Sequence, residues 1–386
     1  MSYNMIESFL GAYMQKILKY LYKDKVFVIA FTFAVISMFI IKPSSAYLDY
    51  INYKVLIIML TLMLAVAGVY ETHFFDFVAT KLVIRFRSIK WIGLVIILVT
   101  FFLGMLLTND AVLLTLVPFT IFITKHTKQE KYTVIIIILQ TIAANMGSAL
   151  TPMGDPQNIY LYAFYDIPFS DFLAVTIPIS IMGFLLVSGT AMLKIPNNHC
   201  ELNLKAPDVD WKRLGLYGII LLNALLSVLR IVPEWYTLYV TLILGLIYGR
   251  HLFKRVDYTL LLTFTSFFIF TGNLSQMSFI VDSIGAFLNT RTSVFFSGLI
   301  ASQFISNVPA AVLLSTFTAP IHWPALLQGV NIGAMGTIIS SLASLITFKY
   351  IVRDYPKEMK RYLLTYSLLS IIFITIISTV VLLLPY

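Results

Sequence analysis

The sequence is poor in charge and in cysteine. Asp, Glu, Lys and Arg make up only 12% of its 386 residues, whereas soluble domains carry about 25%. So weakly charged a chain excludes an ordinary soluble globular protein. The single cysteine, Cys200, excludes an internal disulfide framework and a multi-cysteine metal site.

Catalytic and metal-binding patterns are also missing. The five histidines lie at predicted loop or interface positions, and none is paired at a metal-ligand spacing. They are His73, His126, His199, His251 and His322. No Ser–His or zinc motif is present, and Asp110 and Asp155 lack the motifs of an intramembrane aspartyl protease. The sequence therefore predicts neither an enzyme nor a resident cofactor.

What the sequence has in abundance is apolar residues, 59% of the chain, with a mean hydropathy of +0.89. This composition predicts an all-α polytopic membrane protein. The net charge of +9 is explained by loop lysines and arginines that set membrane topology, so we expect no nucleic-acid partner. The first apolar run, 26–41, follows too long a basic start for a signal peptide, although cleavage near Ser44-Ser45-Ala46 stays open.

Apolar runs predict about nine full spans. They are 26–41, 55–72, 132–162, 172–193, 213–232, 236–249, 257–273, 326–348 and 362–384. Of the 27 Lys and Arg, 23 fall in segments that these spans place on one face, namely 16–25, 81–90, 125–131, 194–213, 250–255 and 349–361. By the positive-inside rule this face is cytoplasmic. We therefore expect a plasma (inner) membrane protein with its amino terminus inside and its carboxyl terminus outside.

Segments 91–124 and 293–318 do not fit as full spans. Basic residues flank the first on both sides, yet two full spans need about 40 residues plus a turn. Each segment has two apolar arms around a polar middle that contains Asn109 or Asn307. These asparagines can cap the returning helices and aim backbone N–H groups at an anion. We interpret both segments as re-entrant helical hairpins that open to opposite faces.

The stretch 145–158 interrupts a predicted span with two prolines, two glycines, a carboxylate and several amides. Since proline disfavours helix for the residue before it, we expect unwinding between Thr151 and Pro156. Irregular backbone at membrane depth is typical of a transporter's substrate or ion site. A weaker copy follows, in which Asn331, Gly333, Thr337, Ser340, Ser341 and Ser344 align with Asn145, Gly147, Thr151, Gly154, Asp155 and Asn158.

Each half of the chain then holds two spans, a hairpin, a broken span and a final span, with one span between the halves. The expected domains are a cytoplasmic amphipathic N-terminus at 1–25, a first transport repeat at 26–194, a linker with one connecting span at 195–235, and a second, inverted repeat at 236–386. Residues 74–90 and 276–291 are expected to lie in the membrane interface as amphipathic helices.

The hairpin tips and the breaks hold the polar residues suited to a substrate and a coupling ion. We expect the substrate to meet Thr108, Asn109, Gln157, Asn158, Ser306, Asn307, Thr337 and Ser344. We expect the coupling ion, Na⁺ or H⁺, at Asn109, Asp110, Asn145, Gly147, Thr151, Asp155, Asn307, Asn331, Gly333, Ser340 and Ser341.

Carboxylates deep in a membrane are costly and therefore indicate function. The same residue types also suit simpler roles, since Asp and Asn cap helices while Ser and Thr bond between them. No Lys or Arg is expected at a depth where it can clamp an anion.

At these residues the chain resembles the ion transporter superfamily, which includes arsenical-pump membrane proteins, citrate-transporter-like permeases, sodium/proton antiporters and divalent anion–sodium symporters. The resemblance is carried by Thr108-Asn109-Asp110, 150–158, Ser306-Asn307-Val308-Pro309 and 340–344. It implies a homodimer, an elevator mechanism and sodium or protons as coupling ions. In the symporter branch each tip reads Ser-Asn-Thr, and both tips here depart from that pattern.

We therefore predict a secondary active transporter that moves a small anion, a carboxylate or an inorganic oxyanion, with Na⁺ or H⁺. A sodium/proton antiporter and a permease that exports arsenite or antimonite stay open as alternatives. A channel also stays open, since hairpins build pores too. The expected partners are a small-molecule or ion substrate, the lipid bilayer and a second copy of the chain.

Overall fold

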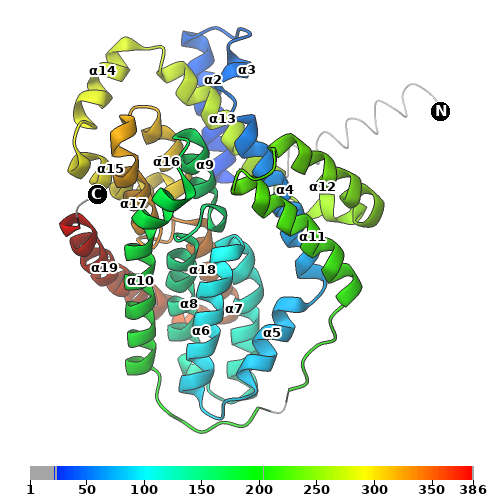
Figure 1. Ribbon diagram of the computed structural model, residues 1–386. Helices are drawn as coiled ribbons and strands as arrows, with labels where there is room; N and C mark the ends of the chain where they lie inside the picture. Colours follow the sequence, from blue (N-terminus) through cyan, green and yellow to red (C-terminus); the bar gives the residue numbers. More distant parts are fainter. Residues whose placement is uncertain (1–20, 22–23, 203, 385–386) are drawn as a thin grey trace, which may run out of the picture.

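The computed structural model describes residues 21, 24–202 and 204–384, and within these residues the protein is helical without strands (Figure 1). The predicted amphipathic N-terminus at 1–25 lies outside the described residues, apart from 21, 24 and 25. The first helices are α2 (Lys25–Ile40), α3 (Tyr47–Tyr50), α4 (Tyr53–Glu71), α5 (Phe74–Val83), α6 (Ile89–Leu106), α7 (Asn109–His126), α8 (Thr133–Ser148), α9 (Pro156–Phe164) and α10 (Phe169–Lys194). The later ones are α11 (Trp211–Val228), α12 (Glu234–Tyr248), α13 (Tyr258–Leu274), α14 (Ser278–Phe287), α15 (Arg291–Ile305), α16 (Asn307–Ser315), α17 (Trp323–Gly333), α18 (Leu342–Asp354) and α19 (Met359–Leu383).

Among the described residues, five helical segments are long and apolar enough to cross a membrane. They are α4, α6, α10, α11 and Pro356–Leu383, which contains α19. A sixth span results if α13 and α14, which are bent by 100° at their junction, count as one. An all-α fold with several membrane-length apolar helices is therefore confirmed, and the number of nine full spans stays a prediction.

Both predicted hairpin tips coincide with helix breaks. Leu107 and Thr108 separate α6 from α7, and Ser306 alone separates α15 from α16. Ser306 has a φ of 73°, a region that residues other than glycine seldom occupy. The arms of each pair pack against each other. That they are re-entrant stays a prediction.

The predicted unwinding of the first broken helix is confirmed. α8 ends at Ser148, a short 3-10 turn covers Pro152–Gly154, and α9 begins at Pro156. Proline fits the first helical position because its missing N–H would have no partner there. The weaker copy also unwinds, since α17 ends at Gly333 and α18 begins at Leu342.

Carbonyl groups freed by the first break find donors inside the protein. The Asn158 amide donates to the Ser148 and Thr151 oxygens at 3.1 and 3.3 Å, and the Thr176 hydroxyl of α10 donates to the Leu150 oxygen at 3.0 Å. Buried backbone oxygens without partners are costly, above all within lipid. The break is therefore a stable feature of the packed structure.

The second break is satisfied in a comparable way. The carbonyls of 333–335 accept from the Gln303 amide at 2.9 Å, the Ser340 hydroxyl at 2.7 Å and the Tyr366 hydroxyl at 3.1 Å. The Ser341 hydroxyl then accepts the Ser344 N–H at 3.1 Å and caps α18.

Glycines allow close helix contact at matching places in the two halves. α6 packs on α8, and α15 packs on α17. A Cβ at Gly147 of α8 would collide with the Phe101 carbonyl oxygen of α6. A Cβ at Gly333 of α17 would lie 3.0 Å from the Leu299 carbonyl oxygen of α15. Backbones that approach this closely need small residues at the contact.

Threonines also match between the halves. The Thr151 hydroxyl, in the first break, donates to the Met105 carbonyl near the end of α6. The Thr337 hydroxyl, in the second break, donates to the Gln303 carbonyl near the end of α15 at 3.0 Å. Each break is thus tied to the arm that leads to the nearby tip.

The remaining helices surround these groups. α2 packs against α13, and α4 packs against α11 and α12, whereas α6, α7 and α8 lie side by side in the lower half of Figure 1. α9 contacts both α4 and α16, and α18 contacts α7. The two tips and the two breaks therefore converge in one region of the protein.

Candidate functional site

Asp155 lies at the centre of this region, directly before α9, and is 3% exposed. Its Oδ2 atom accepts hydrogen bonds from Asn109 Nδ2 at 2.7 Å and Asn307 Nδ2 at 3.5 Å. These asparagines are the first residues of α7 and α16. One carboxylate is therefore shared by the first break and both tips.

The two tip asparagines have the same orientation. Each turns its side-chain oxygen to the following backbone N–H, that of Asp110 at 2.8 Å and that of Val308 at 3.0 Å. Each amide NH₂ group is then left to face Asp155. The Asn307 N–H donates to the Ser340 carbonyl at 2.9 Å. The backbone N–H groups of Asp110, Asn307 and Val308 are therefore occupied, and the side-chain amides of both tips reach Asp155.

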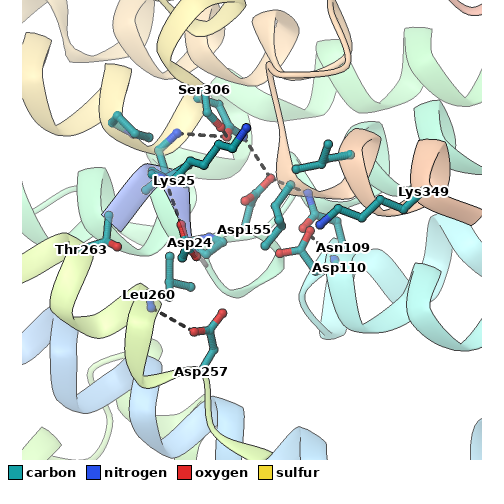
Figure 2. A pocket seen from close by; sticks show the side chains of 17 residues that line it. Asp24, Lys25, Asn109, Asp110, Asp155, Asp257, Leu260, Thr263, Ser306 and Lys349 are labelled. Carbon is teal, nitrogen blue, oxygen red and sulfur yellow. Dashed lines mark hydrogen bonds between the residues drawn. The ribbon is translucent and has the colours of Figure 1, made fainter. Parts of the chain in front are cut away.

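A cavity of about 440 Å³ lies beside this carboxylate, a volume that suits a small molecule. From the predicted site it is lined by Asn109, Asp110, Asp155, Ser306 and Asn307. Figure 2 shows Asp155 in the middle of the lining, with Asn109 and Asp110 on one side and Asp24 and Lys25 on the other. The cavity thus contains both carboxylate and ammonium groups.

Sequence reasoning missed four charged residues of this lining, namely Asp24, Lys25, Asp257 and Lys349. The expectation that no Lys or Arg reaches the site is wrong at the lining, because helix packing brings Lys25 and Lys349 from distant basic segments to the cavity. Asp24 and Asp257 are the N-cap residues of α2 and α13. An aspartate at the start of an apolar run is the sequence signal by which these caps can be found.

Behind the cavity wall, asparagines join the two breaks. The Asn145 oxygen accepts from Asn109 at 3.0 Å, and its amide donates to the Ser341 hydroxyl at 3.4 Å. In the other direction, the Asn331 amide donates to the Asn158 oxygen at 2.7 Å. The two breaks are thus linked through side-chain hydrogen bonds.

Other predicted site residues lie outside the cavity lining. They are Thr108, Asn145, Gly147, Thr151, Gln157, Asn158, Asn331, Gly333, Thr337, Ser340, Ser341 and Ser344. Gln157 and Asn158 are fully buried between the breaks, and Ser344 shares a 2.8 Å hydrogen bond with Tyr366. Their part in binding a substrate or an ion stays a prediction.

Two buried oxygens of the site, Asp110 Oδ1 and Gln157 Oε1, have no hydrogen-bond donor among the described residues. Oxygen acceptors of this kind suit a hard cation or a proton. No group of three or more His, Cys, Asp or Glu side chains in the described part is placed to hold a metal ion.

Comparison with known proteins gives consistent matches. A profile of a family described as citrate transporter matches residues 13–322. An uncharacterized transporter of Methanocaldococcus jannaschii is 32% identical over 313 residues, which cover 80% of this chain and 84% of that protein. The inner membrane protein YbiR of Escherichia coli is 28% identical over 306 residues, which cover 78% of this chain and 80% of that protein.

Proposed function

The chain belongs to the citrate transporter family, and on that premise we propose that it is a secondary active permease for a small anion. The anion is a carboxylate or an inorganic oxyanion, and its movement is coupled to Na⁺ or H⁺. The protein works as a multi-pass component of the plasma (inner) membrane and carries out no enzymatic step.

The shared hydrogen bonding of Asp155 carries this proposal. A carboxylate within a membrane bundle is costly, so its presence beside a cavity indicates an ion or proton function. Asn109 and Asn307 both donate to it. A cation or proton taken up by Asp155 therefore changes the contacts of both tips at once, which couples ion binding to their positions.

Charge balance supports cotransport over anion binding alone. The ammonium groups of Lys25 and Lys349 offer donors to an anion in the cavity. The lining also contains four aspartates, including Asp110 and Asp155, whose charge repels an anion. A cation or proton that offsets the carboxylate charge favours entry of the anion, and the two then move together.

We further propose that the halves are inverted repeats whose hairpins are α6–α7 and α15–α16. The paired contacts of Gly147 and Gly333, and of Thr151 and Thr337, support this arrangement. As the resemblance implies, the hairpins and broken helices would form a mobile transport unit. The other spans, α2, α4, α10, α11, α12, α13 and α19, would form the scaffold of a homodimer, and the mechanism would be an elevator.

Positions 85 and 128 are expected to face the same, cytoplasmic side, because basic residues flank the α6–α7 pair at both ends. Arg85→Cys and Lys128→Cys in a Cys200→Ser background are labelled with a membrane-impermeant maleimide, in right-side-out and in inverted vesicles. Asn289→Cys, at an exposed position before α15, serves as the control for the opposite face. Labelling of positions 85 and 128 from different sides would contradict the hairpin.

Uptake into proteoliposomes tests the function directly. Radiolabelled small carboxylates and oxyanions are offered with and without a sodium gradient or a pH gradient. We expect saturable uptake of one anion class that stops when its gradient is removed, whereas non-saturating flux indicates a channel. If no anion moves under any gradient, the permease proposal fails.

A sodium/proton antiporter is the second candidate, favoured by the four cavity aspartates, which exceed the two lysines in number. Such a protein needs carboxylates that exchange a sodium ion for protons and needs no anion. Dye-reported proton efflux on addition of sodium, without any added anion, distinguishes it from the permease. Arsenite or antimonite export is removed as an alternative if deletion of the gene leaves arsenite tolerance unchanged.

A further inference from the structure

Two cavities lie at opposite ends of α13. The cavity beside Asp155 is lined by Asp257, Leu260 and Thr263 from the start of this helix. A second cavity of about 550 Å³ is lined by Phe268, Thr271 and Ser275 from its end. A helix of 17 residues is about 25 Å long. In the proposed topology the two ends of α13 lie toward different faces of the membrane, and each cavity lies beside one of them.

The same division is found on α9. Pro156, at its start, lines the cavity beside Asp155, whereas Tyr160 and Phe164 line the second cavity. The second cavity also takes in 49–54, before and at the start of α4, and Thr316 at the end of α16. Both cavities thus lie along one surface, where α9 and α16 meet α13.

Along α9 and α13, aromatic rings lie between the residues that line the cavity beside Asp155 and the end of each helix that lines the second cavity. Phe264 is fully buried, and Tyr160 and Phe268 are nearly so. The Tyr160 ring lies 6.3 Å from Phe264 and 5.7 Å from Phe268, and the two phenylalanine rings are 5.9 Å apart, centroid to centroid. Close apolar packing of this kind excludes water and ions.

α9 is held to its two neighbours, α16 and α13, in different ways. The Tyr160 hydroxyl bonds to the Ser315 hydroxyl of α16 at 2.8 Å, and both residues belong to the proposed transport unit. Among the described residues, no hydrogen bond joins α9 to α13, and the contact between them is made by the rings. Ring contacts can slide without leaving polar groups unpaired. This suits a surface along which the transport unit moves.

We propose that Tyr160, Phe264 and Phe268 form the seal that separates the two sides of the membrane in this conformation. The proposal rests on the proposed function, because an elevator transporter must keep one cavity closed from the other while its unit moves. In this assignment Tyr160 travels with the transport unit, whereas Phe264 and Phe268 stay with the scaffold.

Thiol labelling on either side of the rings tests the seal. Thr263→Cys and Thr271→Cys are made in the Cys200→Ser background and treated with a small, permanently charged thiol reagent, in right-side-out and in inverted vesicles. We expect position 263 to react only from the predicted cytoplasmic side and position 271 only from the other side. Reaction of both cysteines from the same side would overturn the proposal, independently of the results with other variants.

Opening the seal is expected to abolish this sidedness. With Phe264→Ala added, each cysteine becomes reactive from both sides, because the cavity left by the ring connects the two linings. Phe172→Ala is the matched control, since Phe172 is equally buried on α10 but lines neither cavity. Unchanged sidedness in a folded Phe264→Ala protein, judged by its elution and melting profile, also overturns the proposal.

Tyr160→Leu removes less volume and gives the same measurement if Phe264→Ala does not fold. Burial raises the pKa of the Cys200 thiol, so the native residue reacts slowly, and its removal clears the remaining background.

The sidedness of labelling can be measured without a substrate or a coupling ion. A failed uptake assay therefore leaves this result standing, and a failed labelling result leaves the uptake assay standing.

Discussion

Replacement of Asp155 by asparagine is expected to lower cation-coupled transport roughly 10- to 100-fold, because hydrogen bonds to a charged group contribute about 1.5–3 kcal/mol and each 1.4 kcal/mol is about tenfold. The amide keeps the volume of the side chain and one acceptor oxygen. It loses the negative charge that attracts a cation and that strengthens the bonds from Asn109 and Asn307. The largest loss should appear at low sodium or a weak proton gradient.

The measurement is the initial uptake rate as a function of sodium concentration and of pH, in proteoliposomes with equal amounts of protein. Asp282→Asn makes the same chemical change at an exposed position on α14 and should leave the rate unaltered. Asp155→Glu keeps the charge but displaces it, and it should retain a weakened ion dependence. Wild-type rates and ion dependence in Asp155→Asn would remove this carboxylate from the coupling mechanism.

Local chemistry made much of the architecture predictable. Prolines at 152 and 156 fixed the first break, because proline cannot continue a helix from the preceding turn. Polar residues between apolar arms located the breaks at 107–108 and 306. The second break has no such proline, and its sequence signal was correspondingly weak. Its stability comes from donors such as Gln303 and Tyr366, which are distant along the chain.

The composition of the cavity was less predictable, because its lining also combines residues that are distant along the chain. Lys25 and Lys349 come from segments more than 300 residues apart. Each lies in a basic segment, which by itself indicates only the cytoplasmic face of the membrane. Gln157 and Asn158 are adjacent to Asp155, yet they turn away from the cavity lining and into the contact between the breaks. Packing against other helices decides which face of α9 meets the cavity. This helix has only 9 residues, and the spacing of its apolar residues does not determine that face.

Gly147→Ala is expected to destabilise the protein by about 1–3 kcal/mol or more, the range typical of overpacking. The added Cβ would meet the Phe101 carbonyl oxygen and would lie 3.1 Å from its Cα, and backbone atoms cannot rotate away as a side chain can. α8 would have to move off α6, and the first break with Asn145 would move with it. Transport should therefore fall together with stability.

Gly189→Ala gives the opposite expectation from the same chemical change, since no atom lies within 4 Å of a Cβ at this position on α10. Alanine favours a helix over glycine by roughly 0.5–1 kcal/mol, so this variant should be unchanged or slightly more stable. Gly333→Ala should fall between the two, because its Cβ would meet the Ser302 side chain at 2.9 Å and the Leu299 oxygen at 3.0 Å. Melting temperatures in detergent would rank the three variants. A Gly147→Ala protein as stable as Gly189→Ala would mean that α6 and α8 do not approach as closely as the structure places them.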